Sequence, residues 1–187
     1  MEEVPGISLD KVVDQLSDDK LTALASQLKS FLDLLSCVPH HQTIGSVDGG
    51  AFRTLLVPAR YQPQQPFHTV AEFNNYLGSL YGQCVITPEV FAEHMSSLPT
   101  DDSIRFTHGD LVPKNIMVDA EGARITGIID WGNSGFYPSY WEYCRMHDAN
   151  SNKVGWAKIL SKVFTEPKRQ KEIDAVRAIL ATIDTQF

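Results

Sequence analysis

HGDLVPKNIMVD at residues 108–119 is followed by GIIDW at residues 127–131, and these two segments decide the fold. They place an aspartate, an asparagine and a second aspartate, Asp110, Asn115 and Asp130, at short intervals along the chain. Phosphoryl transfer needs one carboxylate that accepts the proton of an attacking hydroxyl. It also needs an amide oxygen and a second carboxylate that hold Mg²⁺ against the nucleotide phosphates. The spacing predicts that Asp110 is the catalytic base and that Asn115 and Asp130 are metal ligands.

The residues between the two segments predict a β-hairpin. Residues 116–118 are apolar and β-prone, residues 119–122 have turn composition, and residues 125–129 form a second apolar run. Asn115 would stand at the near end of this hairpin and Asp130 at its far end, so both return to Asp110. We include His108 in the catalytic set, and we expect its ring to support the loop by bonding to backbone near Asp130.

His-Gly-Asp, four residues, Asn, a short hairpin and Ile-Asp-Trp together resemble the aminoglycoside phosphotransferase and choline kinase family, which is related to the protein kinases. Three further segments resemble that family. Residues 1–6 are similar to its interlobe hinge, residues 44–50 to a loop of its fungal-type branch, and residues 135–142 to the segment after its metal-binding aspartate. The resemblance implies ATP and Mg²⁺ as cofactors and a small molecule with a hydroxyl group as substrate.

The resemblance also implies a fold. It predicts an α+β, mainly α-helical structure over residues 1–187, a protein-kinase-like carboxy-terminal lobe with a central β-hairpin that begins at the hinge. We expect the amino-terminal lobe to be missing, because the sequence contains neither a Gly-rich phosphate loop nor a Val-Ala-Ile-Lys-like strand. We therefore expect weak ATP affinity, and we expect the open face to be covered by a partner chain or by a second copy in a homodimer.

Apolar periodicity predicts that the rest of the chain is helical, apart from a long connection over residues 39–66. Ser17, Thr69 and Thr87 have the positions of helix caps. The predicted helices span about residues 18–37, 69–81, 87–97, 139–147, 153–164 and 168–183.

A group of aromatic residues follows Asp130. Trp131, Tyr140 and Trp141 could form a substrate wall whose ring faces receive a cationic ammonium group, and Glu142 could attract an amine. The alternative is that these aromatic rings belong to the core and that the carboxylate is structural. Both interpretations are carried forward.

Composition excludes several classes of partner. The net charge of −7 argues against nucleic acid, because neutralising a phosphate backbone needs clustered Lys and Arg. No stretch is long and apolar enough for a membrane span, and three cysteines without metal-ligand spacing are expected to be reduced thiols in a cytoplasmic protein.

Three functions are compatible with the sequence. The first is a phosphotransferase that uses ATP and Mg²⁺. The second is a binding or regulatory remnant, because loss of enclosure around the nucleotide would impair the positioning on which phosphoryl transfer depends. The third is an enzyme repurposed for nucleotide-independent chemistry, with Asp110 as general base.

Overall fold

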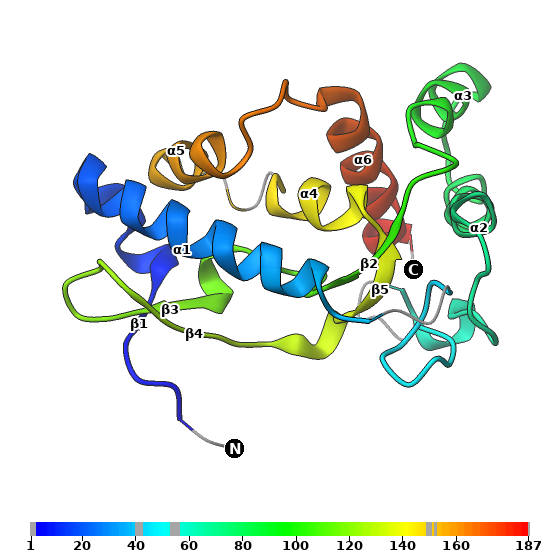
Figure 1. The fold of residues 1–187 in the computed structure, drawn as a ribbon. Helices are drawn as coiled ribbons and strands as arrows, with labels where there is room; N and C mark the ends of the chain where they lie inside the picture. The colour runs from blue at the N-terminus through cyan, green and yellow to red at the C-terminus, as the bar shows by residue number, and fades with distance from the viewer. Residues whose placement is uncertain (1–2, 40–42, 53–56, 149–150, 152, 187) are drawn as a thin grey trace.

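Helices dominate the fold, and short strands form two small sheets (Figure 1). The structure is a computed structural model that describes residues 3–39, 43–52, 57–148, 151 and 153–186. The α+β, mainly helical class predicted from the sequence is confirmed. The helices are α1 (Asp18–Ser36), α2 (Val70–Tyr81), α3 (Pro88–Ser96), α4 (Tyr140–Met146), α5 (Val154–Val163) and α6 (Gln170–Gln186). The strands are β1 (Ile7–Ser8), β2 (Ile104–Thr107), β3 (Ile116–Val118), β4 (Ile125–Ile128) and β5 (Gly135–Pro138).

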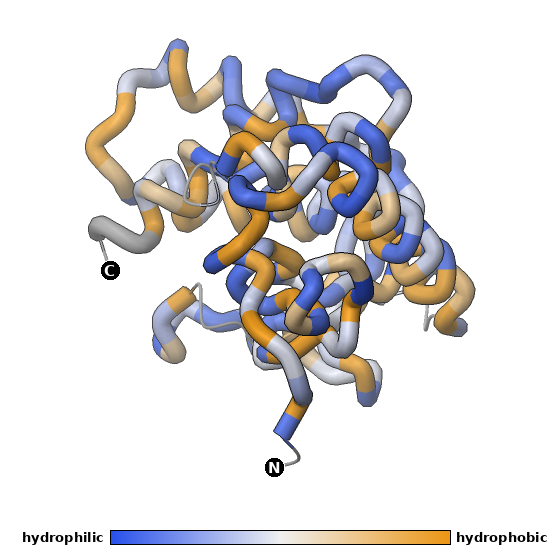
Figure 2. The backbone as a smooth tube through the Cα atoms, turned by 90° about the vertical axis from the view of Figure 1, so that its left-hand side faces the viewer, coloured by the Kyte–Doolittle hydropathy of each residue, from blue (hydrophilic) through white to orange (hydrophobic). Residues whose placement is uncertain are grey.

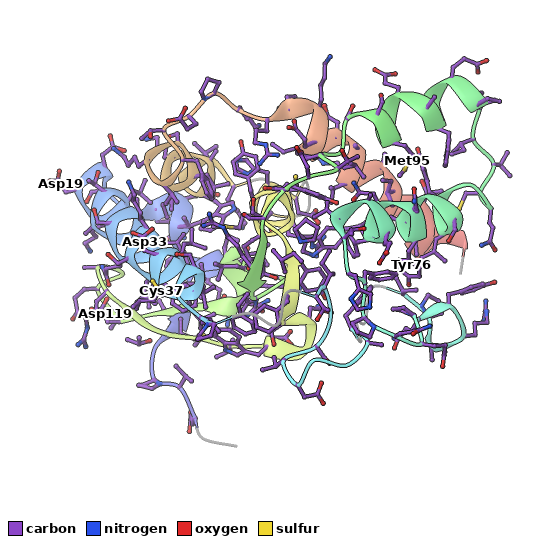
Figure 3. The ribbon with its side chains drawn as sticks, turned by 45° about the vertical axis from the view of Figure 1, so that its right-hand side comes forward. Asp19, Asp33, Cys37, Tyr76, Met95 and Asp119 are labelled. Carbon is purple, nitrogen blue, oxygen red and sulfur yellow. The ribbon has the colours of Figure 1, made fainter. Side chains whose placement is uncertain are left out.

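The predicted hairpin is formed by β3 and β4, which pair antiparallel with Ile116 opposite Ile128. Asp119 closes the turn, because its Oδ1 accepts the N–H groups of Ala123 at 2.8 Å and Arg124 at 3.2 Å. Figure 3 shows Asp119 at this turn, beneath α1. The hairpin therefore brings the two chain ends that carry Asn115 and Asp130 together, as the sequence indicated.

Two strand pairings were not predicted. The short strand β1 adds to the hairpin beside β3, and β2 pairs with β5 in a separate two-stranded sheet. The expectation that the chain is helical apart from the hairpin is therefore wrong. These strands are two to four residues long and pair with distant residues, so local composition gives them almost no signal.

Helix α4 lies between two groups of helices (Figure 1). α1 and α5 pack together on one side, and α6 contacts α2, α3 and α4 on the other. Each group buries its own apolar cluster. Hydrophobic and hydrophilic residues alternate along the helices, because only one side of each helix faces such a cluster (Figure 2). The end of β5 and the start of α4 lie near the centre of the molecule, next to the loop that carries Asp110 (Figure 1).

The predicted caps of α2 and α3 are confirmed. The hydroxyl of Thr69 accepts the N–H of Glu72 at 3.1 Å, and the Glu72 carboxylate accepts the N–H of His68 at 2.7 Å, which makes a reciprocal cap. Thr87 accepts the N–H of Val90 at 3.4 Å. Ser17 stands at the amino-terminal end of α1, as predicted, but its side chain makes no capping hydrogen bond.

The connection over residues 39–66 includes two segments, 40–42 and 53–56, that lie outside the described residues. Its described part is tied down at several points. Ile44 bridges to Phe67 and Gly45 bridges to Phe136, and the Tyr76 hydroxyl of α2 donates to the carbonyl of Tyr61 at 3.0 Å (Figure 3). Within the described ranges, no helix has both the length and the apolar character that crossing a membrane requires.

Candidate active site

The loop from His108 to Asn115 connects β2 to β3 and carries the first two predicted site residues. Gly109 makes its sharp turn possible. It has φ of +80°, and a Cβ at this position would lie 2.3 Å from the carbonyl oxygen of Asn133. Any side chain here would clash with that backbone, so glycine is required for the loop to pass beside Asn133.

Asp110 and Asn115 are in direct contact. The Asn115 amide nitrogen donates to the Asp110 backbone carbonyl at 2.8 Å and to its carboxylate Oδ2 at 2.9 Å. Two cations also hold the carboxylate. Lys114 Nζ lies 3.0 Å from Oδ2, and Arg145 Nη2 lies 3.0 Å from Oδ1. Asp110 is thus nearly buried and fixed in orientation from both oxygens.

Asp130 follows β4 and is positioned by the hairpin. The N–H of Ile129 donates to the carbonyl of Asn115 at 2.9 Å, which brings the residue before Asp130 against the end of the His108–Asn115 loop. Asp130 has φ of 65° and ψ of 61°, the left-handed conformation that aspartate tolerates better than most residues. The chain therefore turns sharply at Asp130 and leaves the hairpin.

The residues at this site have the donor chemistry that Mg²⁺ prefers. Asn115 uses its amide nitrogen on Asp110, so its amide oxygen remains as an acceptor, and Asp130 offers carboxylate oxygens. Within the described residues, no three His, Cys, Asp or Glu side chains gather as a metal site. Two protein oxygens completed by water and phosphate oxygens is the usual mode of Mg²⁺ binding, so the residues fit that ion.

His108 holds the loop against the hairpin, as expected from the sequence. Its Nδ1 accepts the N–H of Asp110 at 3.3 Å, so Nε2 carries the proton and donates to the carbonyl of Ile129 at 3.0 Å. Burial lowers the pKa of His108, against the opposing effects of the Ile129 carbonyl and of the charges of Asp110 and Asp130. His108 is therefore a neutral structural link between the two segments that carry the carboxylates.

Glu142 supports the same loop from the opposite side. Its Oε2 accepts the backbone N–H groups of His108 and, at 3.2 Å, Gly109. Burial raises the pKa of Glu142 to about 7, although its hydrogen bonds to the loop backbone and the charge of Arg145 oppose this shift. Oε1 is buried without a hydrogen-bond partner among the described residues. Glu142 is buried and holds the backbone of this loop, in keeping with the structural alternative.

The raised pKa gives a testable pH dependence. The folded-state pKa of Glu142 exceeds its ordinary value, so its protonated form favours folding and this contribution is lost as pH rises through about 7. Between pH 5 and pH 8 the free energy of unfolding should fall by up to roughly 3 kcal/mol more in the wild type than in Glu142→Gln. Urea denaturation at several pH values measures this, with Glu121→Gln in the exposed hairpin turn as the control. Parallel curves for wild type and Glu142→Gln would contradict it.

Arg145 is the functional residue that sequence reasoning missed. Its guanidinium bridges Asp110 Oδ1 and Asp148 Oδ2, at 3.0 Å and 2.8 Å, and Nε donates to the carbonyl of Gly109 at 3.3 Å. Only 9% of the side chain is exposed. Arg145 and Asp148 are three residues apart at the end of a predicted helix, so their ion pair had a local sequence signal. The pairing of Arg145 with Asp110 joins residues 35 apart and had no such signal.

The other aromatic candidates separate into one surface residue and two core residues. Trp131 is 39% exposed, and its ring lies 4.7 Å from that of His108 at the edge of the site. Tyr140 is buried and donates to Asn74 at 2.6 Å, and Trp141 is buried in a stack on Tyr137. Tyr140 and Trp141 are therefore core residues, in keeping with the core alternative, whereas Trp131 is partly exposed beside His108.

Comparison with known proteins assigns the chain to a family. The model of the phosphotransferase enzyme family matches residues 1–164. None of the curated proteins that were searched matches the chain.

Solved structures of aminoglycoside phosphotransferases share the fold. The GDP complex of wild-type aminoglycoside 2'-phosphotransferase-IIIa has a TM-score of 0.61 and 18% identity, with 96% of this chain and 58% of that chain covered. The GDP and kanamycin complex of APH(2")-IIIa has a TM-score of 0.60 and 20% identity, with 98% and 60% covered. A thermostable mutant of APH(4)-Ia in ternary complex with ADP and hygromycin B has a TM-score of 0.64 and 15% identity, with 100% and 65% covered.

The chain thus spans 58 to 65% of the length of these three structures. The predicted start at an interlobe hinge and the assignment to a fungal-type branch stay predictions. The match of the family model over most of the sequence, on a fold that carries the predicted loop and hairpin, shows that the chain belongs to the phosphotransferase enzyme family.

Proposed function

We propose that this chain carries the catalytic base and metal ligands of a phosphotransferase that moves a phosphoryl group from ATP to a hydroxyl of a small molecule. The observation that carries the proposal is the direct contact of Asp110 with Asn115, at the point where the hairpin brings back Asp130. Asp110 is the base, and Asn115 and Asp130 are the ligands of Mg²⁺. When bound, Mg²⁺ would neutralise charge on the phosphates during transfer.

Asp110 has the geometry of an orienting base. The amide of Asn115 and the guanidinium of Arg145 hold its carboxylate in one rotamer, so an incoming hydroxyl would meet a fixed acceptor. Holding the base in place reduces the entropy lost on reaching the transition state, which is the main contribution a protein makes to phosphoryl transfer. His108 and Glu142 position this base through the loop backbone.

ATP and a small-molecule acceptor are proposed on two grounds. Related structures are complexes with GDP or ADP, and two also hold kanamycin or hygromycin B. In this chain the exposed ring of Trp131 beside His108 is the surface on which an acceptor could rest. We propose no role in substrate binding for Tyr140, Trp141 or Glu142.

One observation favours the alternative of a binding or regulatory protein without turnover. Both carboxylate oxygens of Asp110 are already engaged, one by Arg145 and the other by Asn115 and Lys114. Lys114 is exposed and can move away, but Arg145 is buried. If the base cannot release one of these partners, the site would bind without catalysing.

Transfer of label from γ-labelled ATP tests the proposal. The chain is incubated with a panel of hydroxyl compounds, including aminoglycosides, with and without Mg²⁺. Mg²⁺-dependent label on at least one acceptor is expected. Label on no acceptor, combined with measurable Mg²⁺-dependent ATP binding, would favour the alternative.

Two further proposals concern assembly and location. We propose self-association of this chain, which sedimentation over a wide concentration range tests, and a strict monomer at high concentration would contradict it.

Cys37, Cys84 and Cys144 are free thiols, in keeping with the cytoplasmic location that we propose. Labelling of the thiols in intact cells, compared with labelling after lysis, tests that location.

A further inference from the structure

A cavity of 460 Å³ lies among α4, α5, α6 and the connection between the last two helices. Its lining includes Tyr143 from α4, His147 directly after that helix, Trp156 from α5, and Arg177 from α6. None of Asp110, Asn115 and Asp130 lines it. The cavity is therefore separate from the candidate active site, and the function proposed above makes no use of it.

Helix α4 divides the cavity from the active site. Tyr143 and His147 are one helical turn apart and face the cavity, whereas Arg145, halfway between them, reaches to Asp110. Residues two positions apart on a helix point in roughly opposite directions, so the two sites lie on opposite faces of α4.

Two cations, Lys168 and Arg177, line the cavity together with His147. Burial lowers the pKa of His147, the carbonyl of Tyr143 opposes this shift, and the charges of Lys168 and Arg177 lower the pKa further. Arg177 donates to the carbonyl of His147 at 3.0 Å. Lys168 Nζ forms no ion pair with any described residue, and Arg177 lies 3.6 Å from the exposed carboxylate of Asp174. Such a pair of cations beside a neutral imidazole favours an anion.

Two carboxylates, Asp148 and Glu166, also line the cavity. Asp148 is committed to Arg145 at 2.8 Å. Glu166 is the other carboxylate of the lining, and Lys153 adds a third cation, 3.7 Å from Asp10. Among the described residues, the lining therefore carries three cations, Lys153, Lys168 and Arg177, against two carboxylates, of which Asp148 is paired with Arg145.

Aromatic rings form the wall next to these cations. The ring of Tyr143 lies 4.4 Å from that of His147 and 4.8 Å from that of Phe164. Trp156 uses its indole N–H on the carbonyl of Met146 at 2.9 Å, so the part of its ring that lines the cavity is apolar. A flat ring in this cavity would gain edge and stacking contacts.

We propose that this cavity is a second ligand site, which binds a small aromatic anion with its anionic group at Lys168 and Arg177 and its ring against Tyr143 and Phe164. The volume suits a single-ring ligand, because small-molecule sites usually have volumes of about 300–1,000 Å³. The proposal does not depend on phosphotransferase activity. It predicts binding by the chain whether or not Asp110 is catalytic.

Binding of benzoate and phenyl phosphate, followed by the NMR shift of the His147 ring proton, tests the site. Both probes are expected to bind and to shift this resonance, with affinities at least about tenfold above those of inorganic phosphate and benzyl alcohol, which each lack one half of the recognised group. Benzoate binding alone would place the site with carboxylates, and phenyl phosphate binding alone with phosphate esters. No binding of either probe would overturn the proposal.

Charge variants locate the site. The double variant Lys168→Gln, Arg177→Gln should bind about tenfold more weakly, whereas Lys171→Gln, which removes one positive charge outside the lining, should change affinity less than about twofold. The single Lys168→Gln change at an exposed residue gives a folded variant with an intermediate loss. If Asp130→Asn abolishes binding of the probes, or if the double variant binds as tightly as wild type, the probes occupy another site and the proposal is wrong.

Discussion

Replacing Arg145 with methionine should lower the free energy of unfolding by about 3–5 kcal/mol, because it leaves two carboxylates without the cation that bridges them. Arg145 joins Asp110 at 3.0 Å to Asp148 at 2.8 Å, and only 9% of its side chain is exposed. Methionine fills much of the same space, so the loss reports the charge and hydrogen bonds more than a cavity. Urea denaturation at neutral pH measures it.

Two matched variants make this result specific. Arg124→Met removes an exposed guanidinium 3.8 Å from Asp119 and should cost less than about 1 kcal/mol. Adding Asp110→Asn and Asp148→Asn to Arg145→Met should restore part of the lost stability, because no unpaired buried charge then remains. If Arg145→Met costs no more than Arg124→Met, the bridge does not stabilise the fold and its role in fixing Asp110 fails with it.

Asp110→Asn should reduce the turnover number for phosphoryl transfer by about 10²–10⁴-fold, the usual contribution of a positioned general base. The affinity for ATP should change little, because Asp110 is proposed to act on the acceptor hydroxyl and not on the metal. Steady-state assays with the acceptor identified by label transfer would measure both quantities, with Asp33→Asn on the exposed face of α1 as the control (Figure 3). A lower ATP affinity with unchanged turnover would assign Asp110 to nucleotide binding instead.

The sequence was most informative where chemistry and local structure depend on the same few residues. The hairpin that joins Asn115 to Asp130 could be predicted because turn composition between two apolar, β-prone runs fixes it locally. The helix caps at Thr69 and Thr87 were also predictable for that reason, since the cap and its N–H partner are three residues apart.

The interactions that position the site were harder to predict because they join distant residues. Arg145 meets Asp110 and Glu142 meets the backbone of His108 across more than thirty residues, and a single sequence carries no record of such pairings. Tyr140, Trp141 and Glu142 illustrate the same limit. Their types suit a substrate wall equally well, and only packing at the start of α4 shows that they are buried. The pairing of β2 with β5 was not predicted either, because each strand is too short to show its own pattern.

The measurement that tests the proposed site most directly is ATP binding by calorimetry with Mg²⁺, and with EDTA in its place, for wild type, Asp110→Asn and Asp130→Asn. ATP binding should require Mg²⁺, should persist in Asp110→Asn, and should weaken at least about tenfold in Asp130→Asn, because that variant loses a charged metal ligand. Equal ATP affinity in EDTA, or in Asp130→Asn, would contradict the assignment of Asn115 and Asp130 as the ligands of a magnesium nucleotide.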